Sequence, residues 1–257
     1  MFNYICVMVI TRFLAQVGEF TLMLKGMFKR PENRKVYWKE FVHQCYDIGV
    51  RSLPIVLIIS AFLGAVMTLQ SAYQLVSPVV PRHVIAQIVR DSTILELAPT
   101  LICVVLAGVV GSKIASELGN MRISEQIDAL EIMGINTKTF LVAPKIIAAM
   151  LMVPLLIILS IFVSMAGGYA AASITGAVSP EAFHYGLTTD FVAFNMYVAM
   201  AKAITFAFII SSIPAYYGYN VKGGALEIGR ASTTSVVVSC ITILCADYAI
   251  TVLMLNG

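Results

Sequence analysis

Three ionisable residues, Glu96, Lys202 and Asp247, lie in stretches of sequence that are otherwise almost free of charge. An ionised side chain in hydrocarbon costs several kcal/mol unless it is solvated or paired, so these residues are the first candidates for a polar site. We expect Lys202 to pair with Glu96 or Asp247, either to hold a helix bundle together or to form part of a polar relay. For Glu96, a purely structural pair with Arg90 or Lys202 is the alternative to a place in a substrate cavity.

Residues typical of enzymes form no recognisable pattern in this chain. His43, His83 and His184 are scattered, and the five cysteines include no CxxC pair and no zinc-type spacing. The stretch 108–113, with the sequence GVVGSK, has the wrong spacing for a phosphate-binding loop. We therefore expect no catalytic residue, no metal site and no ATPase site in this chain.

The composition indicates an integral membrane protein. Of the 257 residues, 59% are apolar and 12% are charged. Soluble domains have roughly 45–50% apolar and about 25% charged residues. One helical crossing takes about 20 apolar residues, so the length allows four to six crossings and excludes a large soluble catalytic domain. The net charge of +3 is small, and we expect no nucleic-acid partner.

Stretches with few or no charges locate the crossings. We expect five transmembrane helices, at residues 52–81, 92–112, within 146–180 with an exit near 173, 191–216 and 231–255. If the N-terminal segment is cytoplasmic, fourteen Lys and Arg residues fall on the inner side and two, Arg82 and Arg90, on the outer side. The positive-inside rule strongly favours this orientation.

The N-terminal segment, residues 1–48, is expected to differ from the transmembrane domain at 49–257. Apolar residues recur there every three or four positions and draw one stripe on a helix: Ile5, Val9, Phe13, Val17, Phe20, Leu24 and Met27. This pattern predicts a helix lying in the cytoplasmic membrane interface. A sixth crossing is the alternative.

The connection between residues 113 and 145 contains an amphipathic segment. One face is apolar, formed by Ile123, Ile127, Leu130 and Met133, and Gly134 is a plausible C-terminal stop. We expect a helix at about 120–134, outside the membrane. Its apolar face either packs against the protein's own helix ends or the lipid surface, or docks as a coupling helix into a groove of a soluble partner.

Small residues four positions apart predict close helix packing. They occur at Ala107, Gly108, Gly111 and Ser112, and the pair Gly167-Gly168 could act likewise. The pattern leaves open whether the contacts lie within one chain or between two copies. The predicted fold class is therefore an all-α integral membrane protein with five transmembrane helices, an N-terminal interfacial helix and a cytoplasmic amphipathic helix.

The stretch 117–134, with the sequence ELGNMRISEQIDALEIMG, resembles the signature of the MlaE/YrbE permeases, the membrane subunits of ABC-type lipid transporters that work with MCE proteins. Shorter matches are ELAP at 96–99, APK at 143–145 and GRAST at 229–233. The resemblance extends over roughly residues 30–257.

The resemblance implies a permease subunit of an ATP-driven transporter in the bacterial inner membrane, which moves phospholipid between the inner and outer membranes through a lipid cavity at a homodimer interface. The implied partners are a second copy of the chain, a cytoplasmic ABC ATPase, an MCE-domain protein on the periplasmic side and, optionally, a small cytoplasmic STAS-type subunit. ATP and magnesium would be bound by the ATPase, and this chain would bind no cofactor. The resemblance also implies that the cytoplasmic amphipathic helix is a coupling helix.

Two groups of site residues follow from the resemblance and from the intramembrane charges. The expected substrate-binding residues are Met67, Gln70, Gln74, Leu75, Glu96, Leu97 and Lys202. The expected ATPase-coupling residues are Glu117, Met121, Arg122, Glu125, Gln126, Leu130 and Met133. Gln70 and Gln74 could instead be interfacial residues facing water. Leu95 stands where many family members have an arginine, so a headgroup role for an Arg–Glu pair is not carried over.

Two other functional classes stay open. A secondary transporter of an amphiphilic or small polar substrate would usually show internal repeats and broken helices, and no convincing repeat is visible. A membrane-embedded enzyme would need a catalytic constellation. Transport that depends on a proton gradient without ATP would favour the first class, and turnover by the isolated chain the second.

Overall fold

The structure, a computed structural model, describes residues 2–27, 34–75 and 81–255, and these residues form helices and their connections without a strand. Five helical segments are long and apolar enough to cross a membrane: Lys35–Gln74, His83–Ile123, Lys138–Thr175, Ala193–Tyr219 and Ala225–Met254. They confirm the five predicted crossings. Residues 76–80, at the end of the first predicted crossing, lie outside the described residues.

Several segments are built from more than one element. The first contains α2 (Arg34–Gly49), η1 (Val50–Ser52) and α3 (Leu53–Gln74). The second contains α4 (His83–Ser92), η2 (Thr93–Leu101), α5 (Ile102–Leu106), η3 (Ala107–Gly111) and α6 (Ser112–Ile123). The third contains η4 (Lys138–Val142) and α8 (Ala143–Thr175), and the last two are α10 (Ala193–Tyr219) and α11 (Ala225–Leu255). The segments η2, η3 and η4 are π-helical.

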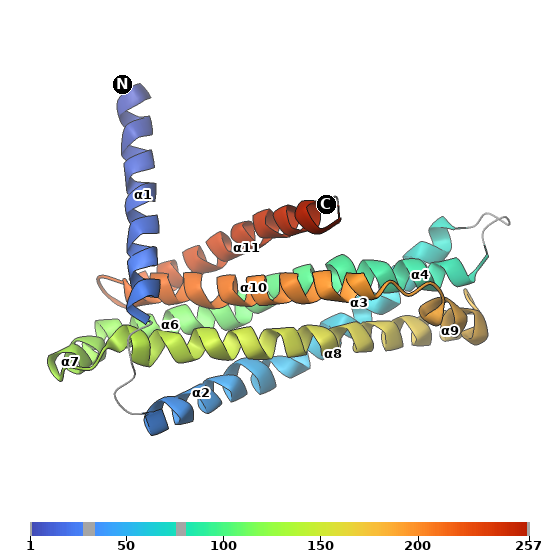
Figure 1. The fold of residues 1–257 in the computed structure, drawn as a ribbon, viewed down its shortest axis with the longest axis horizontal. Coiled ribbons are helices and arrows are strands. Elements are labelled where there is room, and N and C mark those ends of the chain that lie inside the picture. The colour runs from blue at the N-terminus through green and yellow to red at the C-terminus, as the bar shows by residue number, and fades with distance from the viewer. Residues whose placement is uncertain (1, 28–33, 76–80, 256–257) are drawn as a thin grey trace.

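The long helices run side by side, and the short elements gather at the two ends of the bundle (Figure 1). One end carries α7 (Gln126–Ile132), the start of α2 and the connection between α10 and α11. The other end carries α4 and α9 (Pro180–Thr188). The predicted inner side corresponds to the end with α7, and we refer to it as the α7 end.

The N-terminal helix α1 (Phe2–Met27) runs across the direction of the long helices at the α7 end (Figure 1). Its C-terminal turn is anchored, because the carbonyl of Gly26 accepts hydrogen bonds from Asn136 Nδ2 at 3.1 Å and from Thr139 Oγ1 at 3.2 Å. This direction agrees with the predicted interfacial helix rather than with a sixth crossing. Within the predicted apolar stripe, Phe20, Leu24 and Met27 pack against the core, whereas the side chains of Ile5, Val9 and Phe13 lie outside the described residues.

The helix α2 continues through η1 into α3 and packs against α8. At the α7 end, Asp47 of α2 forms ion pairs with Lys113 of α6 at 2.8 Å and with Arg51 at 3.0 Å. The helical segment that contains the first crossing therefore begins before residue 49. The division of the chain into 1–48 and 49–257 stays a prediction.

Small residues bring α3 and α8 together. Gly64 lies against the backbone carbonyl of Ser164, and Gly167 lies against that of Ala61, so a Cβ atom at either glycine would collide with backbone. The predicted close packing at Gly167 is thus present and lies within one chain. In the other small-residue group, Gly111 packs against Pro214 of α10.

The predicted coupling helix is shorter than expected. The helix α6 ends at Ile123, where the Ser124 hydroxyl donates to the Asn120 carbonyl at 2.7 Å, and Glu125 then adopts a left-handed φ of 59°. The separate helix α7 covers only 126–132, so the prediction of one helix at about 120–134 was wrong at its start. Its end is as predicted. Gly134 has a φ of 81°, and the Ile135 amide donates to the Leu130 carbonyl, which is the Schellman arrangement.

Candidate functional site

The ammonium group of Lys202 is fully buried and joins three helical segments. Its Nζ atom donates to Glu96 Oε1 at 2.8 Å and to the Leu95 carbonyl at 3.0 Å, both in η2. It also forms an ion pair with Asp247 Oδ1 of α11 at 2.7 Å. The predicted pairing of Lys202 is therefore present, and it involves both candidate carboxylates. We call Glu96, Lys202 and Asp247 the charge cluster.

The backbone of η2 explains why a carbonyl takes part. Pro99 has no N–H, so the α-helical donor for the carbonyl four residues earlier, that of Leu95, is missing. Lys202 donates to this carbonyl. On the other side of the carboxylate, Thr100 Oγ1 donates to Glu96 Oε2 at 3.4 Å. The sequence around Pro99 thus provides both an acceptor and a donor next to Glu96.

The charge cluster opens to the outside of the single chain through Glu96. The side chain of Glu96 is 46% exposed, whereas that of Asp247 is 16% exposed and that of Lys202 is 0% exposed. An exposed carboxylate in a membrane-spanning segment requires a polar or water-filled surrounding. The arrangement can hold a polar group of a ligand at Glu96 while Lys202 stays fixed beneath it.

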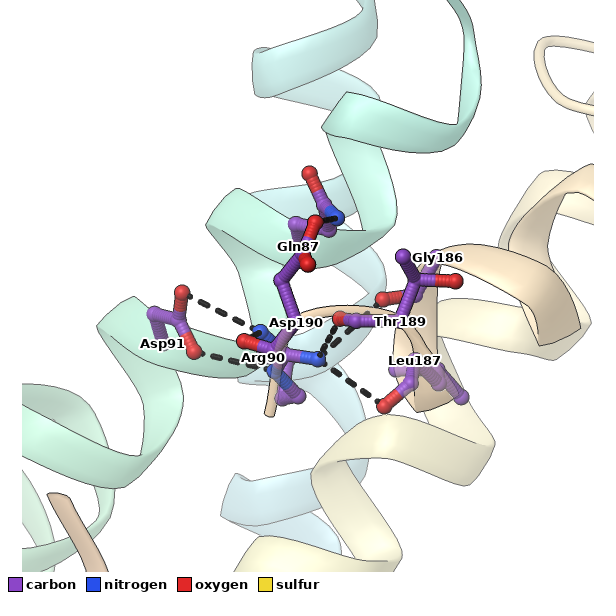
Figure 2. A network of polar contacts seen from close by, with 7 residues as sticks. All are labelled: Gln87, Arg90, Asp91, Gly186, Leu187, Thr189 and Asp190. Atoms are coloured by element: carbon purple, nitrogen blue, oxygen red, sulfur yellow. Dashed lines mark hydrogen bonds and ion pairs between the residues drawn. The ribbon is translucent and has the colours of Figure 1, made fainter. Parts of the chain in front are cut away.

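Arg90 does not contact Glu96, so the alternative pairing proposed from the sequence was wrong for this residue. Its buried guanidinium instead caps the C-terminal end of α9 (Figure 2). Nη1 donates to the carbonyls of Gly186, Leu187 and Thr189 at 3.3, 3.0 and 2.8 Å, and Nη2 donates to that of Asp190 at 3.2 Å. Carbonyl oxygens at a helix end attract a cation, so this interaction is structural.

Of the other predicted substrate-binding residues, only Leu97 adjoins the charge cluster. Met67 and Leu75 of the first segment pack against a small apolar cluster at the α9 end, around Val89 and Phe183. Gln70 and Gln74 are exposed, and Leu97 is half-buried beside Glu96. Their role in substrate binding stays a prediction.

The predicted coupling residues divide into an outward-facing and an inward-facing set. Glu125, Gln126 and Met133 are exposed, and Met133 is joined by the exposed Ile132. The inward-facing residues have partners inside the chain. Glu117 forms an ion pair with the buried Lys145 at 2.7 Å, Arg122 pairs with Asp128 at 2.6 Å, and Met121 and Leu130 pack against the core.

A hydrogen-bonded joint fastens α7 to the end of α10. Tyr219 donates its hydroxyl proton to Glu131 Oε1 at 2.8 Å, and Thr137 Oγ1 donates to the same oxygen at 3.0 Å. We call Glu131, Thr137 and Tyr219 the α7 joint. Sequence reasoning missed it, because Glu131 and Tyr219 are 88 positions apart and no local pattern links them.

The α7 joint lowers the pKa of Glu131 below its ordinary value. The hydrogen bond from Tyr219 is the largest cause, partial burial opposes it, and the Thr137 hydroxyl and the charges of Arg122 and Lys138 add to the lowering. Each of these groups favours the ionised carboxylate. The joint is therefore strongest when Glu131 is deprotonated.

Replacing Lys202 by Met tests the charge cluster. Glu96 and Asp247 would then lack their shared cation, and removing one partner of a buried pair costs about 3–5 kcal/mol. We expect Lys202→Met to lower the free energy of unfolding in mild detergent by that amount. The double variant Lys202→Met/Asp247→Asn should recover part of the loss, since it also removes the more buried carboxylate. Wild-type stability of Lys202→Met would contradict the assignment.

Replacing Glu131 by Gln tests the α7 joint through its pH dependence. Because the pKa of Glu131 is lowered in the folded chain, its stabilisation is complete above the ordinary value of 4.5 and is lost as the pH falls through the folded value. We expect Glu131→Gln to lower Tm by roughly 2–4 °C at neutral pH, and the difference from wild type to shrink below pH 4.5. The matched control is Glu125→Gln, whose exposed side chain forms no hydrogen bond within the described part of the chain. A pH-independent difference would refute the joint.

Comparisons with known proteins agree with this architecture. The family described as Permease MlaE matches residues 41–253. A probable ABC transporter permease of Synechocystis sp. is 36% identical, over 84% of this chain and 82% of its own length. Another probable ABC transporter permease, of Rickettsia felis, is 35% identical over 93% of this chain and 92% of its own length.

A plant relative extends the comparison. The chloroplastic Protein TRIGALACTOSYLDIACYLGLYCEROL 1 of Arabidopsis thaliana is 30% identical over 87% of this chain and 63% of its own length. The family match covers most of the transmembrane part of the chain, and the bacterial relatives match along nearly their whole lengths. This chain therefore belongs to the MlaE family of ABC transporter permeases.

Proposed function

We propose that this permease moves phospholipid between the inner and outer membranes of a bacterium, and that the charge cluster lies at the lipid cavity. The observation that carries the proposal is the exposed carboxylate of Glu96, held by Lys202 inside a membrane-spanning bundle. A site for an amphiphile combines apolar walls with a few fixed polar groups. The plant relative has a lipid, trigalactosyldiacylglycerol, in its name, which also favours a lipid cargo.

A second copy of the chain is proposed to complete the cavity. Glu96 is 46% exposed, and contact with lipid tails would be costly for a carboxylate. Next to the cluster, α11 diverges from the other long helices (Figure 1) and exposes an apolar stripe of Val237, Ile241, Leu244 and Tyr248. A homodimer that brings these surfaces together would enclose Glu96, with α3, η2 and α11 as walls. Met67, Gln70, Gln74, Leu75 and Leu97 are proposed to line this cavity.

The α7 end is proposed to receive a cytoplasmic ABC ATPase, which binds ATP and magnesium. Family membership implies an ATPase partner, because permease subunits of ABC transporters usually leave hydrolysis to another chain. Exposed Ile132 and Met133 offer apolar contacts on α7, and exposed Glu125 and Gln126 offer polar ones. An MCE-domain protein would stand on the periplasmic end, and a STAS-type subunit is an additional candidate on the cytoplasmic side.

The α7 joint supplies a path from the ATPase to the cavity. Glu131 fastens α7 to Tyr219, and Tyr219 lies on the same helix as Lys202. A push on α7 would therefore reach α10 and shift Lys202 relative to Glu96 and Asp247. We propose that this movement opens or squeezes the cavity around the lipid headgroup.

Charge reversal at Glu125 tests the coupling role of α7. We expect Glu125→Lys to leave the chain in the membrane and ATP hydrolysis by the reconstituted complex active, but to reduce ATP-dependent transfer of fluorescent phospholipid from proteoliposomes by roughly tenfold, a coupling loss of about 1.4 kcal/mol. Glu125 suits this test better than Arg122, because Arg122 pairs with Asp128 inside the chain.

The matched control is Glu181→Lys on α9, at the opposite end of the bundle, which should transfer lipid normally. Normal transfer by Glu125→Lys would refute the coupling role. Transfer that needs an ion gradient and no ATPase would instead identify a secondary transporter.

A further inference from the structure

A polar cavity lies at the α7 end, away from the charge cluster. Its volume is about 650 Å³, within the range of ligand sites. It is bounded by α1, by the C-terminal end of α10 and by the start of α11, and Lys138 closes one side. Three tyrosines at the end of α10, Tyr216, Tyr217 and Tyr219, form part of its wall.

The cations of this cavity outnumber its available anions. Lys138, Lys222 and Arg230 line it together with two carboxylates, Glu19 and Glu227. Both carboxylates have partners: Glu19 accepts a hydrogen bond from Tyr216 at 2.9 Å, and Glu227 forms an ion pair with Arg230 at 2.8 Å.

The two lysines are free to receive an anion. Neither Lys138 nor Lys222 forms a salt bridge or hydrogen bond through its side chain within the described part of the chain. Lys138 is held in place along its alkyl part, because it crosses Gly26 of α1, where a side chain would collide with it. An ammonium group positioned in this way is a suitable donor to a phosphate oxygen.

The position of the cavity suits the headgroup layer of a membrane. The helix α1 meets the bundle there with its C-terminal end and runs across the direction of the long helices (Figure 1). Tyrosines are typical of the interface between lipid and water. Leu22 and Met23 of α1 and Val221 add apolar surface beside the lysines. The leaflet at the α7 end is the cytoplasmic one in the orientation favoured by the basic residues, and anionic lipids attract lysines at that surface.

We propose that this cavity binds a phosphate-bearing anion through Lys138 and Lys222, either the headgroup of an anionic phospholipid or a free phosphate. Such a ligand would bridge α1, η4 and the connection between α10 and α11. It would therefore hold α1 against the C-terminal end of α10, which also carries Tyr219 of the α7 joint. The site is separate from Glu96, and its occupation does not depend on the proposed lipid transport.

The test uses the full chain in nanodiscs of phosphatidylcholine that contain a minor fraction of phosphatidylglycerol. Native mass spectrometry then counts the lipids that stay bound to the protein after it is released from the nanodisc. We expect the wild type to retain phosphatidylglycerol in preference to phosphatidylcholine. Lys138→Gln/Lys222→Gln should lower this preference by roughly ten- to thirtyfold, about fivefold for each hydrogen bond that a lysine no longer donates to the phosphate. An unchanged preference in the double variant would overturn the proposal.

Two further variants separate a specific site from general surface charge and from misfolding. Lys25→Gln/Lys39→Gln removes the same charge from exposed positions outside the cavity and should retain the preference. An equal loss in this control would overturn the proposal. Lys222 lies in the exposed connection before α11, so Lys222→Gln alone should fold normally. Its preference for phosphatidylglycerol should fall roughly fivefold, because one hydrogen bond to the phosphate is lost.

A second arm distinguishes the two sources of phosphate. In nanodiscs of phosphatidylcholine alone, inorganic phosphate is added and the Tm is measured. If phosphate raises the Tm of the wild type but not that of Lys138→Gln/Lys222→Gln, the site is supported. If the wild type also fails to retain phosphatidylglycerol, the ligand is a free phosphate. Retention of phosphatidylglycerol supports the headgroup, and no response to either probe overturns the proposal. Because no ATPase is present, these results are independent of transport.

Discussion

The buried ammonium group of Lys202 joins three of the helical segments of this bundle. A cation at this depth must be neutralised, and the chain brings two carboxylates and a backbone carbonyl to it from two other segments. The carbonyl lies in the π-helical η2, which contains Pro99, and the second carboxylate is that of Asp247 on α11. The helix α11 is the least buried of the crossings, and it packs against α10 and α6. The ion pair with Lys202 adds a polar link between α11 and α10.

The helix α10 connects the two regions to which we assign a function. It carries Lys202 in its membrane-spanning part and Tyr219 at its end, where the α7 joint fastens the short helix that faces the proposed ATPase. At both points, polar contacts hold α10 in addition to its apolar packing: a hydrogen bond at Tyr219 and two ion pairs at Lys202. A helix fixed in this way is suited to carry a displacement from one membrane surface to the proposed lipid cavity.

The sequence predicted those features that depend on local composition or on the cost of charge burial. The five crossings follow from charge-poor stretches, and the pairing of Lys202 follows from the cost of an isolated charge in hydrocarbon. The predicted start of the helix that contains α7 was wrong. Glu125 adopts a left-handed conformation that breaks the helix, whereas the apolar periodicity of the sequence continues through this position. The cap at Arg90 and the α7 joint depend on residues about 90 or more positions apart, which no periodicity reveals.

Native mass spectrometry of the complex, purified gently from its own host, tests the central claim most directly. We predict two copies of this chain, two ATPase subunits, a ring of MCE subunits and releasable phospholipid, with less bound phospholipid when Glu96 is replaced by Gln. A lone chain or simple homodimer without ATPase at every detergent strength, or the same amount of lipid in Glu96→Gln, would contradict the assignment of the charge cluster to a lipid cavity in an ATP-driven permease.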